Sequence, residues 1–172
     1  MNQPKGPLEA EFLERLESHR KILYKIANAY CRQTADRDDL VSEMVLALWR
    51  SYPQYDERRA FSTWTYRIAL NVAISFHRKR QRNAAFVASL DESHDRLPSD
   101  EGDEQADTLL AFVGMLPPLD RALMLAYLDG YPQSEIAEMI GLSPTNVSTK
   151  VSRLKDRLRT TMQAHLKGYV HE

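Results

Sequence analysis

Apolar residues recur at every third or fourth position along most of the chain, which is the spacing of helices that bury one face. This spacing predicts helices over residues 8–30, 37–50, 61–81, 108–116 and 119–128, and a pair of helices within 131–159. The first segment fits either one long helix or two short helices that break near Ser18. No segment of the pattern requires a strand, so we predict an all-α fold.

The two helices predicted within residues 131–159 are joined by a tight turn. Gly141 suits a helix C-terminus, and Ser143 and Pro144 suit the start of the next helix. The second helix buries Val147, Val151, Leu154 and Leu158. Its other faces carry Thr145, Asn146, Ser148, Thr149, Lys150 and Arg153. Such short polar and basic side chains suit a helix in the major groove of DNA, but an ordinary helical hairpin with a solvated face also fits this turn.

The helix predicted over residues 37–50 has an acidic face. Asp36 suits its N-cap, because acids stabilise the positive end of a helix. The core stripe consists of Leu40, Val41, Met44, Val45 and Leu48. The polar face consists of Asp38, Asp39, Ser42 and Glu43. From the charge pattern alone, ordinary solvent exposure is the favoured explanation of this face.

Charge divides the chain into a basic, an acidic and a second basic zone. Residues 77–82 carry four formal positive charges, residues 91–107 contain eight acids and one base, and basic residues again prevail after Ser143. The formal net charge of −1 argues against a protein that coats nucleic acid non-specifically. Two local patches that could bind polyanions nevertheless follow from the distribution.

The acidic zone also marks a domain boundary. It contains Pro98 and Gly102 and lacks apolar periodicity, which predicts a flexible linker. We therefore predict two small helical domains, over residues 8–86 and 107–165, joined by an acidic linker over residues 87–106. The C-terminal domain would contain the helix-turn-helix.

Composition narrows the function further. The chain has 172 residues, of which 43% are hydrophobic and 27% charged, as in a soluble globular protein. No apolar run is long enough to span a bilayer, and no secretory signal is evident at the N-terminus, so we predict a cytoplasmic protein. Cys31 stands alone, the five histidines are scattered, and no nucleotide-binding loop or nucleophile pattern is present. We therefore predict no cofactor, no metal site and no enzymatic activity.

Two stretches together resemble the extracytoplasmic-function (ECF) sigma factors of bacterial RNA polymerase, which belong to the sigma-70 family. Residues 36–82 contain D-x-x-D-L-V-x-E, then F-x-x-W-x-Y-R-I-A-x-N and a basic end. Residues 110–159 contain L-P-x-x-x-R, D-G-Y-x-x-x-E-I-A, G-L-S and V-S-x-K-x-S-R. Both stretches stand in the family's order, with a short acidic linker between them.

The resemblance implies roles for the first stretch. Its acidic helix would bind the polymerase through Asp36, Asp39, Leu40 and Glu43. The next helix and its basic end would recognise and melt the −10 element through Arg67, Asn71, Arg78, Lys79, Arg80 and Arg82. Trp64, Tyr66 and Phe76 are candidates for base stacking, with a core position favoured for Trp64. A base-recognition loop would lie within residues 81–87.

The second stretch would recognise the −35 element. The resemblance assigns base or phosphate contacts to Thr145, Asn146, Ser148, Thr149, Lys150 and Arg153. Ser148 stands where the family often has lysine, and Lys150 where it often has arginine, so a bidentate guanine contact at residue 150 is less assured. The acidic linker would run towards the active-site cleft of the polymerase, although a solvated tether fits it equally well.

The resemblance thus predicts an alternative sigma factor that directs promoter-specific initiation. Its partners would be core RNA polymerase and promoter DNA, and an anti-sigma factor is a further partner class that the sequence neither specifies nor excludes. The alternative is a helix-turn-helix regulator that binds an operator without core polymerase, usually as a dimer. The YRIALN helix and the acidic helix before it favour the sigma factor.

Overall fold

The computed structural model describes residues 6–86 and 104–168, and all of their regular structure is helical. The all-α prediction is therefore confirmed over this part of the chain. Two compact units are present, Met1–Phe76 and His77–Glu172. Most of the predicted linker lies outside the described residues, but Glu104–Ala106, its last three residues, form the start of a helix.

The first helix is continuous. Helix α1 spans Pro7–Tyr30, with the proline in its first turn. Ser18 does not break it, and the Ser18 hydroxyl donates to the Glu14 carbonyl oxygen at 3.2 Å within the helix. Of the two arrangements that fitted the sequence, the single long helix is correct.

Helix α2 spans Thr34–Ser51 and begins earlier than the apolar pattern predicts. Gln33 is its N-cap and makes no side-chain capping bond. Asp36 lies inside the first turn, so the prediction that it caps the helix is wrong. A different side-chain bond lies in this turn. The Arg37 guanidinium donates to the Thr34 hydroxyl at 2.7 Å.

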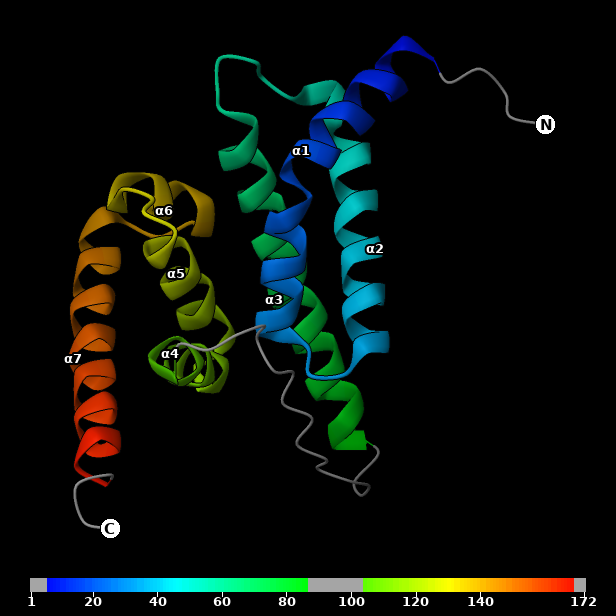
Figure 1. The fold of residues 1–172 in the computed structure, drawn as a ribbon. Helices are drawn as coiled ribbons and strands as arrows, with labels where there is room; N and C mark the ends of the chain where they lie inside the picture. Colours follow the sequence, from blue (N-terminus) through cyan, green and yellow to red (C-terminus); the bar gives the residue numbers. More distant parts are fainter. Residues whose placement is uncertain (1–5, 87–103, 169–172) are drawn as a thin grey trace. The chain divides into compact units, whose positions relative to one another are not determined.

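Helix α3 spans Phe61–Phe86 and follows a short 3₁₀ turn, η1, at Tyr52–Gln54. Figure 1 shows α1 and α2 side by side, with α3 behind them. The core of the first unit is apolar and fully buried. It includes Leu23, Ile26, Leu40, Met44, Leu48, Tyr66 and Leu70.

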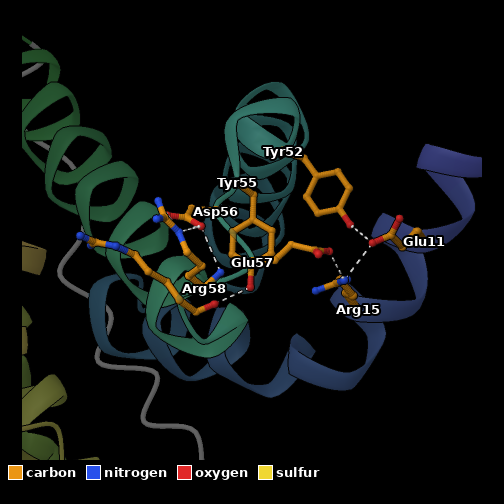
Figure 2. A network of polar contacts seen from close by, with 8 residues as sticks. Glu11, Arg15, Tyr52, Tyr55, Asp56, Glu57 and Arg58 are labelled. Carbon is orange, nitrogen blue, oxygen red and sulfur yellow. Dashed lines mark hydrogen bonds and ion pairs between the residues drawn. The ribbon is translucent and has the colours of Figure 1, made fainter.

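A polar network holds the segment before α3 against α1 (Figure 2). The Tyr52 hydroxyl donates to Glu11 at 2.9 Å, and the Arg15 guanidinium pairs with Glu11 at 2.9 Å and with Glu57 at 2.7 Å. Arg15 also lies 5.7 Å from the centre of the Tyr55 ring. The pKa of Tyr52 is raised, mainly because the hydroxyl is buried and next because it donates a hydrogen bond to Glu11. The segment is thus fixed at the point where α3 begins.

The second unit begins at His77, within α3. Its further helices are α4 (Glu104–Met115), α5 (Pro118–Leu128), α6 (Gln133–Ile140) and α7 (Pro144–Gly168). Its buried core includes Phe112, Leu116, Leu123, Leu125, Ile136, Val147, Val151 and Leu154. Figure 1 shows α7 running beside α5 and α6. Among the described residues of both units, no helix is long and apolar enough to cross a membrane.

The predicted helix-turn-helix is present in α6 and α7. Gly141 ends α6 with a φ of 75°, a left-handed conformation that glycine adopts without strain. The Ser143 hydroxyl accepts a hydrogen bond from the Asn146 N–H at 3.2 Å and so caps α7, with Pro144 in the first turn. The turn chemistry predicted from the sequence is confirmed.

Candidate nucleic-acid interface

The recognition helix α7 separates a buried stripe from a polar face. Val147, Val151 and Leu154 are at most 3% exposed. Most of the residues predicted to contact the −35 element are exposed, namely Thr145, Asn146, Ser148, Thr149 and Arg153. Within the described residues, the Arg153 side chain makes no ion pair or hydrogen bond. This face therefore offers hydrogen-bonding groups near the helix N-terminus, followed by Arg153, a cation without a partner among the described residues.

Lys150 differs from its neighbours because it is already paired. Its ammonium donates to the Asp120 carboxylate of α5 at 2.8 Å, and the two side chains are 39% and 19% exposed. The Lys155 ammonium also faces α5, at 5.6 Å from the centre of the Tyr127 ring. The structure thus places two of the lysines of α7 against its own unit.

Arg121, the arginine of the L-P-x-x-x-R motif, is buried and bonded within its own unit. Its side chain is 7% exposed. The guanidinium donates to the carbonyl oxygens of Gly114 at 2.6 Å and Leu116 at 3.0 Å. These carbonyls belong to the C-terminal turn of α4 and the residue after it, where the helix provides no further donors. Arg121 therefore joins α4 to α5.

A second line of exposed polar residues follows α3. Arg67, Asn71, Arg78 and Arg82 are separated by four, seven and four residues, which places them on one side of the helix. All four are exposed, and within the described residues none makes an ion pair or hydrogen bond. Lys79 is also exposed beside this line. Helical spacing places Arg80 on the opposite side of α3, away from the other predicted −10 contacts.

The aromatic candidates for base stacking occupy different environments. Tyr66 is 1% exposed and belongs to the core, so the prediction that it is available for a base is wrong. Trp64 is half-buried against the rings of Tyr55 and Phe61, with ring centres 4.9 and 5.2 Å away. Phe76 is half-buried. Residues 81–86 continue α3 as a helix, so the predicted base-recognition loop does not begin at Gln81.

The exposed face of α2 mixes acidic and apolar groups. Asp39, Glu43, Leu46 and Arg50 follow one another at steps of four, three and four, and all are exposed. Within the described residues, neither Asp39 nor Glu43 makes an ion pair or hydrogen bond. Asp36 is half-exposed in the first turn. This line is a surface on which an external partner could contact both charge and apolar area.

Leu40 is buried in the core, as its place in the apolar stripe predicted, whereas Leu46 is exposed. Leu40 was predicted to contact the polymerase, but it is 0% exposed and packs in the core. Leu46 was not predicted as a contact, yet it is 46% exposed on the acidic face. The sequence could have predicted this exposure, because Leu46 falls outside the buried stripe formed by Leu40, Met44 and Leu48.

Comparison with known protein families gives two matches. The family model for sigma-70 region 2 matches residues 16–83, and the model for sigma-70 region 4 matches residues 106–158. The first contains α2 and most of α3, and the second contains α5, α6 and the first part of α7. The acidic face of α2, the polar line of α3 and the recognition helix α7 therefore lie inside matched regions.

Named relatives are similar along most of the chain. The ECF RNA polymerase sigma factor SigE of Mycolicibacterium smegmatis is 24% identical over 161 residues, which cover 88% of this chain and 62% of SigE. The ECF RNA polymerase sigma factor SigM of Mycobacterium tuberculosis is 27% identical over 157 residues, which cover 89% of this chain and 75% of SigM. The chain thus spans somewhat under two thirds of SigE and three quarters of SigM.

A solved structure supports the fold. The sigma factor RpoE of Bartonella quintana, determined in complex with the anti-sigma factor NepR, superimposes with a TM-score of 0.76. The match covers 89% of this chain and 97% of RpoE, at 21% sequence identity. At this identity the likeness establishes the all-helical architecture.

Proposed function

Because the chain belongs to the ECF group of the sigma-70 family, we propose that it is an alternative sigma factor that binds core RNA polymerase and directs promoter-specific initiation. The observation that carries the proposal is the presence of both sigma-70 regions, in order, each with an exposed helical face inside it. The face of α2 is acidic, which suits a protein partner, whereas the faces of α3 and α7 are polar and basic, which suits DNA.

Docking on core polymerase is assigned to the exposed face of α2. Asp39 and Glu43 supply negative charge that no other described residue pairs, and Leu46 supplies apolar area between acidic and basic positions. Asp36 adds charge at the first turn. Leu40 supports this surface from the core instead of contacting the partner, because its side chain is fully buried.

Recognition and opening of the −10 element are assigned to α3. Arg67, Arg78 and Arg82 would neutralise phosphates along one side of the helix, with Asn71 among them as a hydrogen-bonding group. Lys79 adds charge beside them. Phosphate contacts of this kind give affinity and salt dependence, and the Asn71 amide is the group best suited to a base edge.

Recognition of the −35 element is assigned to the exposed face of α7. Thr145, Asn146, Ser148 and Thr149 present short hydrogen-bonding side chains near the helix N-terminus, where a recognition helix contacts base edges. Arg153 supplies positive charge one turn further along. Two linked units on one promoter also raise each other's effective concentration.

The proposal includes no catalytic centre in this chain, since core polymerase carries out nucleotide addition, and it places the protein in the cytoplasm with the polymerase. RpoE of B. quintana was determined in complex with an anti-sigma factor. A regulatory protein of this class is therefore part of the proposed set of partners.

The experiment compares the purified chain with and without core polymerase. DNA fragments are first selected by binding to the mixture of the chain and core polymerase. If the chain is a sigma factor, these fragments are retained specifically only when both proteins are present. The two proteins then also elute as a stable complex in size-exclusion chromatography. A helix-turn-helix regulator would retain an operator by itself and leave core polymerase unbound. That second result would replace the proposed function with the regulator.

A further inference from the structure

We infer that Asp120 is a positioning residue for DNA recognition: it holds Lys150 against α5, fixes the orientation of α7, and withdraws this lysine from the DNA. The inference rests on the proposed function, because it concerns the helix to which −35 recognition is assigned. It changes the role that the family pattern suggests for Lys150, from a DNA contact to an internal support.

The first observation is the Lys150–Asp120 pair itself. Its 2.8 Å separation is that of a charge-assisted hydrogen bond, and Asp120 is the more buried partner at 19% exposure. Asp120 lies in the first turn of α5, where a negative charge is also favoured by the helix dipole. The carboxylate is thus held in place by its own helix, and Lys150 reaches it from α7.

The second observation is the contact of Lys155 with Tyr127. On an ideal helix, Lys150 and Lys155 are roughly 140° apart around the axis. They therefore flank the buried stripe of Val147, Val151 and Leu154 on its two edges, and each contacts α5. Contacts on both edges oppose rotation of α7 about its own axis. That rotation decides which side chains enter a DNA groove.

The consequence is a recognition face with little formal charge. With Lys150 paired, the first turns of α7 present Thr145, Asn146, Ser148 and Thr149, and Arg153 is the first cation without a partner among the described residues. Base discrimination would then come from uncharged hydrogen bonds, and phosphate attraction would begin at Arg153. This arrangement favours sequence discrimination over general affinity for DNA.

The test measures how the affinity of the full chain for a random-sequence duplex depends on salt. Asp120→Asn releases Lys150, so the slope of log affinity against log salt becomes steeper by about 1, as expected for one added phosphate contact. Raising the salt from about 50 to about 200 mM then lowers the affinity of the variant about fourfold more than that of the wild type. Asp38→Asn, at an exposed acid whose side chain has no partner among the described residues, changes the net charge equally and is the matched control.

The double variant Asp120→Asn/Lys150→Gln keeps the net charge of the wild type. We expect it to retain the wild-type slope, because Lys150 contributes no phosphate contact in the native chain. A slope that is shallower by about 1 in the double variant would show that Lys150 binds DNA and would overturn the inference. Equal slopes for Asp120→Asn and Asp38→Asn would overturn it as well.

A loss of stability alone cannot imitate the expected result, since unfolding weakens binding and does not add a salt-dependent contact. Failure of the proposed function is also distinguishable. It would appear as the absence of promoter-specific retention with core polymerase, whereas the slope on a random-sequence duplex requires neither polymerase nor promoter.

Discussion

Helices α2 and α7 are built alike, yet they treat their charged residues differently. Each buries one apolar stripe and exposes a polar face. On α2, Asp39 and Glu43 have no ion-pair partner within the described residues. On α7, Lys150 and Lys155 are engaged by α5, while Arg153 is not. A charge is available to an external partner when its own chain leaves it unpaired.

The largest expected effect comes from the buried side of α2. Leu40→Ala removes a side chain that is 0% exposed, and large-to-small changes of this kind cost about 2–5 kcal/mol of unfolding free energy. Denaturant unfolding of the purified chain measures it. Leu46→Ala, on the exposed side of the same helix, is the matched control and should change stability by less than about 1 kcal/mol. Equal costs would mean that Leu40 is not a core residue.

The next effect concerns the unpaired acids of α2. Asp39→Arg with Glu43→Arg should weaken binding to core polymerase at least about tenfold, because both charges are reversed on the proposed docking surface. The fold should stay intact, since neither side chain has an internal partner within the described residues. Titration of labelled protein with core polymerase measures the affinity, and circular dichroism checks the helices.

The control for that pair is Glu14→Arg with Glu17→Arg, which makes the same change of charge on exposed positions of α1. We expect this variant to bind core polymerase like the wild type. An equal loss in both variants would indicate a general charge effect and would remove the specific assignment to α2.

A smaller effect is expected from Arg153, the first cation of α7 that has no partner among the described residues. Arg153→Gln should make the slope of log affinity against log salt shallower by about 1, as for loss of one phosphate contact. Arg159→Gln is the comparison on the same helix, because Arg159 is already paired with Asp156 at 3.3 Å. It should change the slope less. The reverse order of the two variants would contradict the rule that unpaired charges are the ones that bind.

The smallest effect concerns Asp56, an acid of the first unit that is paired with Arg58. Hydrogen bonds from the Arg58 side chain and backbone lower its pKa from 3.8 to about 2. The folded state therefore binds this proton less readily than the unfolded state, so its stabilisation is present above about pH 4 and disappears as pH falls through about 2. Melting temperatures of wild type and Asp56→Asn should differ slightly near pH 5 and converge towards pH 2. A constant difference would contradict this linkage.

The fold was largely predictable because periodic apolar residues determine where helices bury a face. The turn between α6 and α7 was equally predictable, since Gly141, Ser143 and Pro144 each have a specific local role that the structure confirms. The family matches confirm the sigma-factor identification made from the two motif-bearing stretches. These features depend on local chemistry or on pattern.

Pairings between distant residues could not be predicted in this way. Lys150 meets Asp120 across 30 positions of sequence, and nothing in the local pattern of either helix specifies that contact. Periodicity placed Leu40 correctly in the core stripe, whereas the resemblance assigned it to polymerase contact, which its complete burial contradicts. The start of α2 was missed since Gln33 is not a usual capping residue. The assignments of individual DNA and polymerase contacts remain predictions.

The central claim is that this chain gives core polymerase a promoter preference that it lacks alone. The direct measurement maps transcription start sites on fragments of the host genome, with core polymerase in the presence and absence of the purified chain. We predict new start sites that share a pair of upstream elements at constant spacing and that disappear when the chain is omitted. Identical start sites in both reactions would contradict the account.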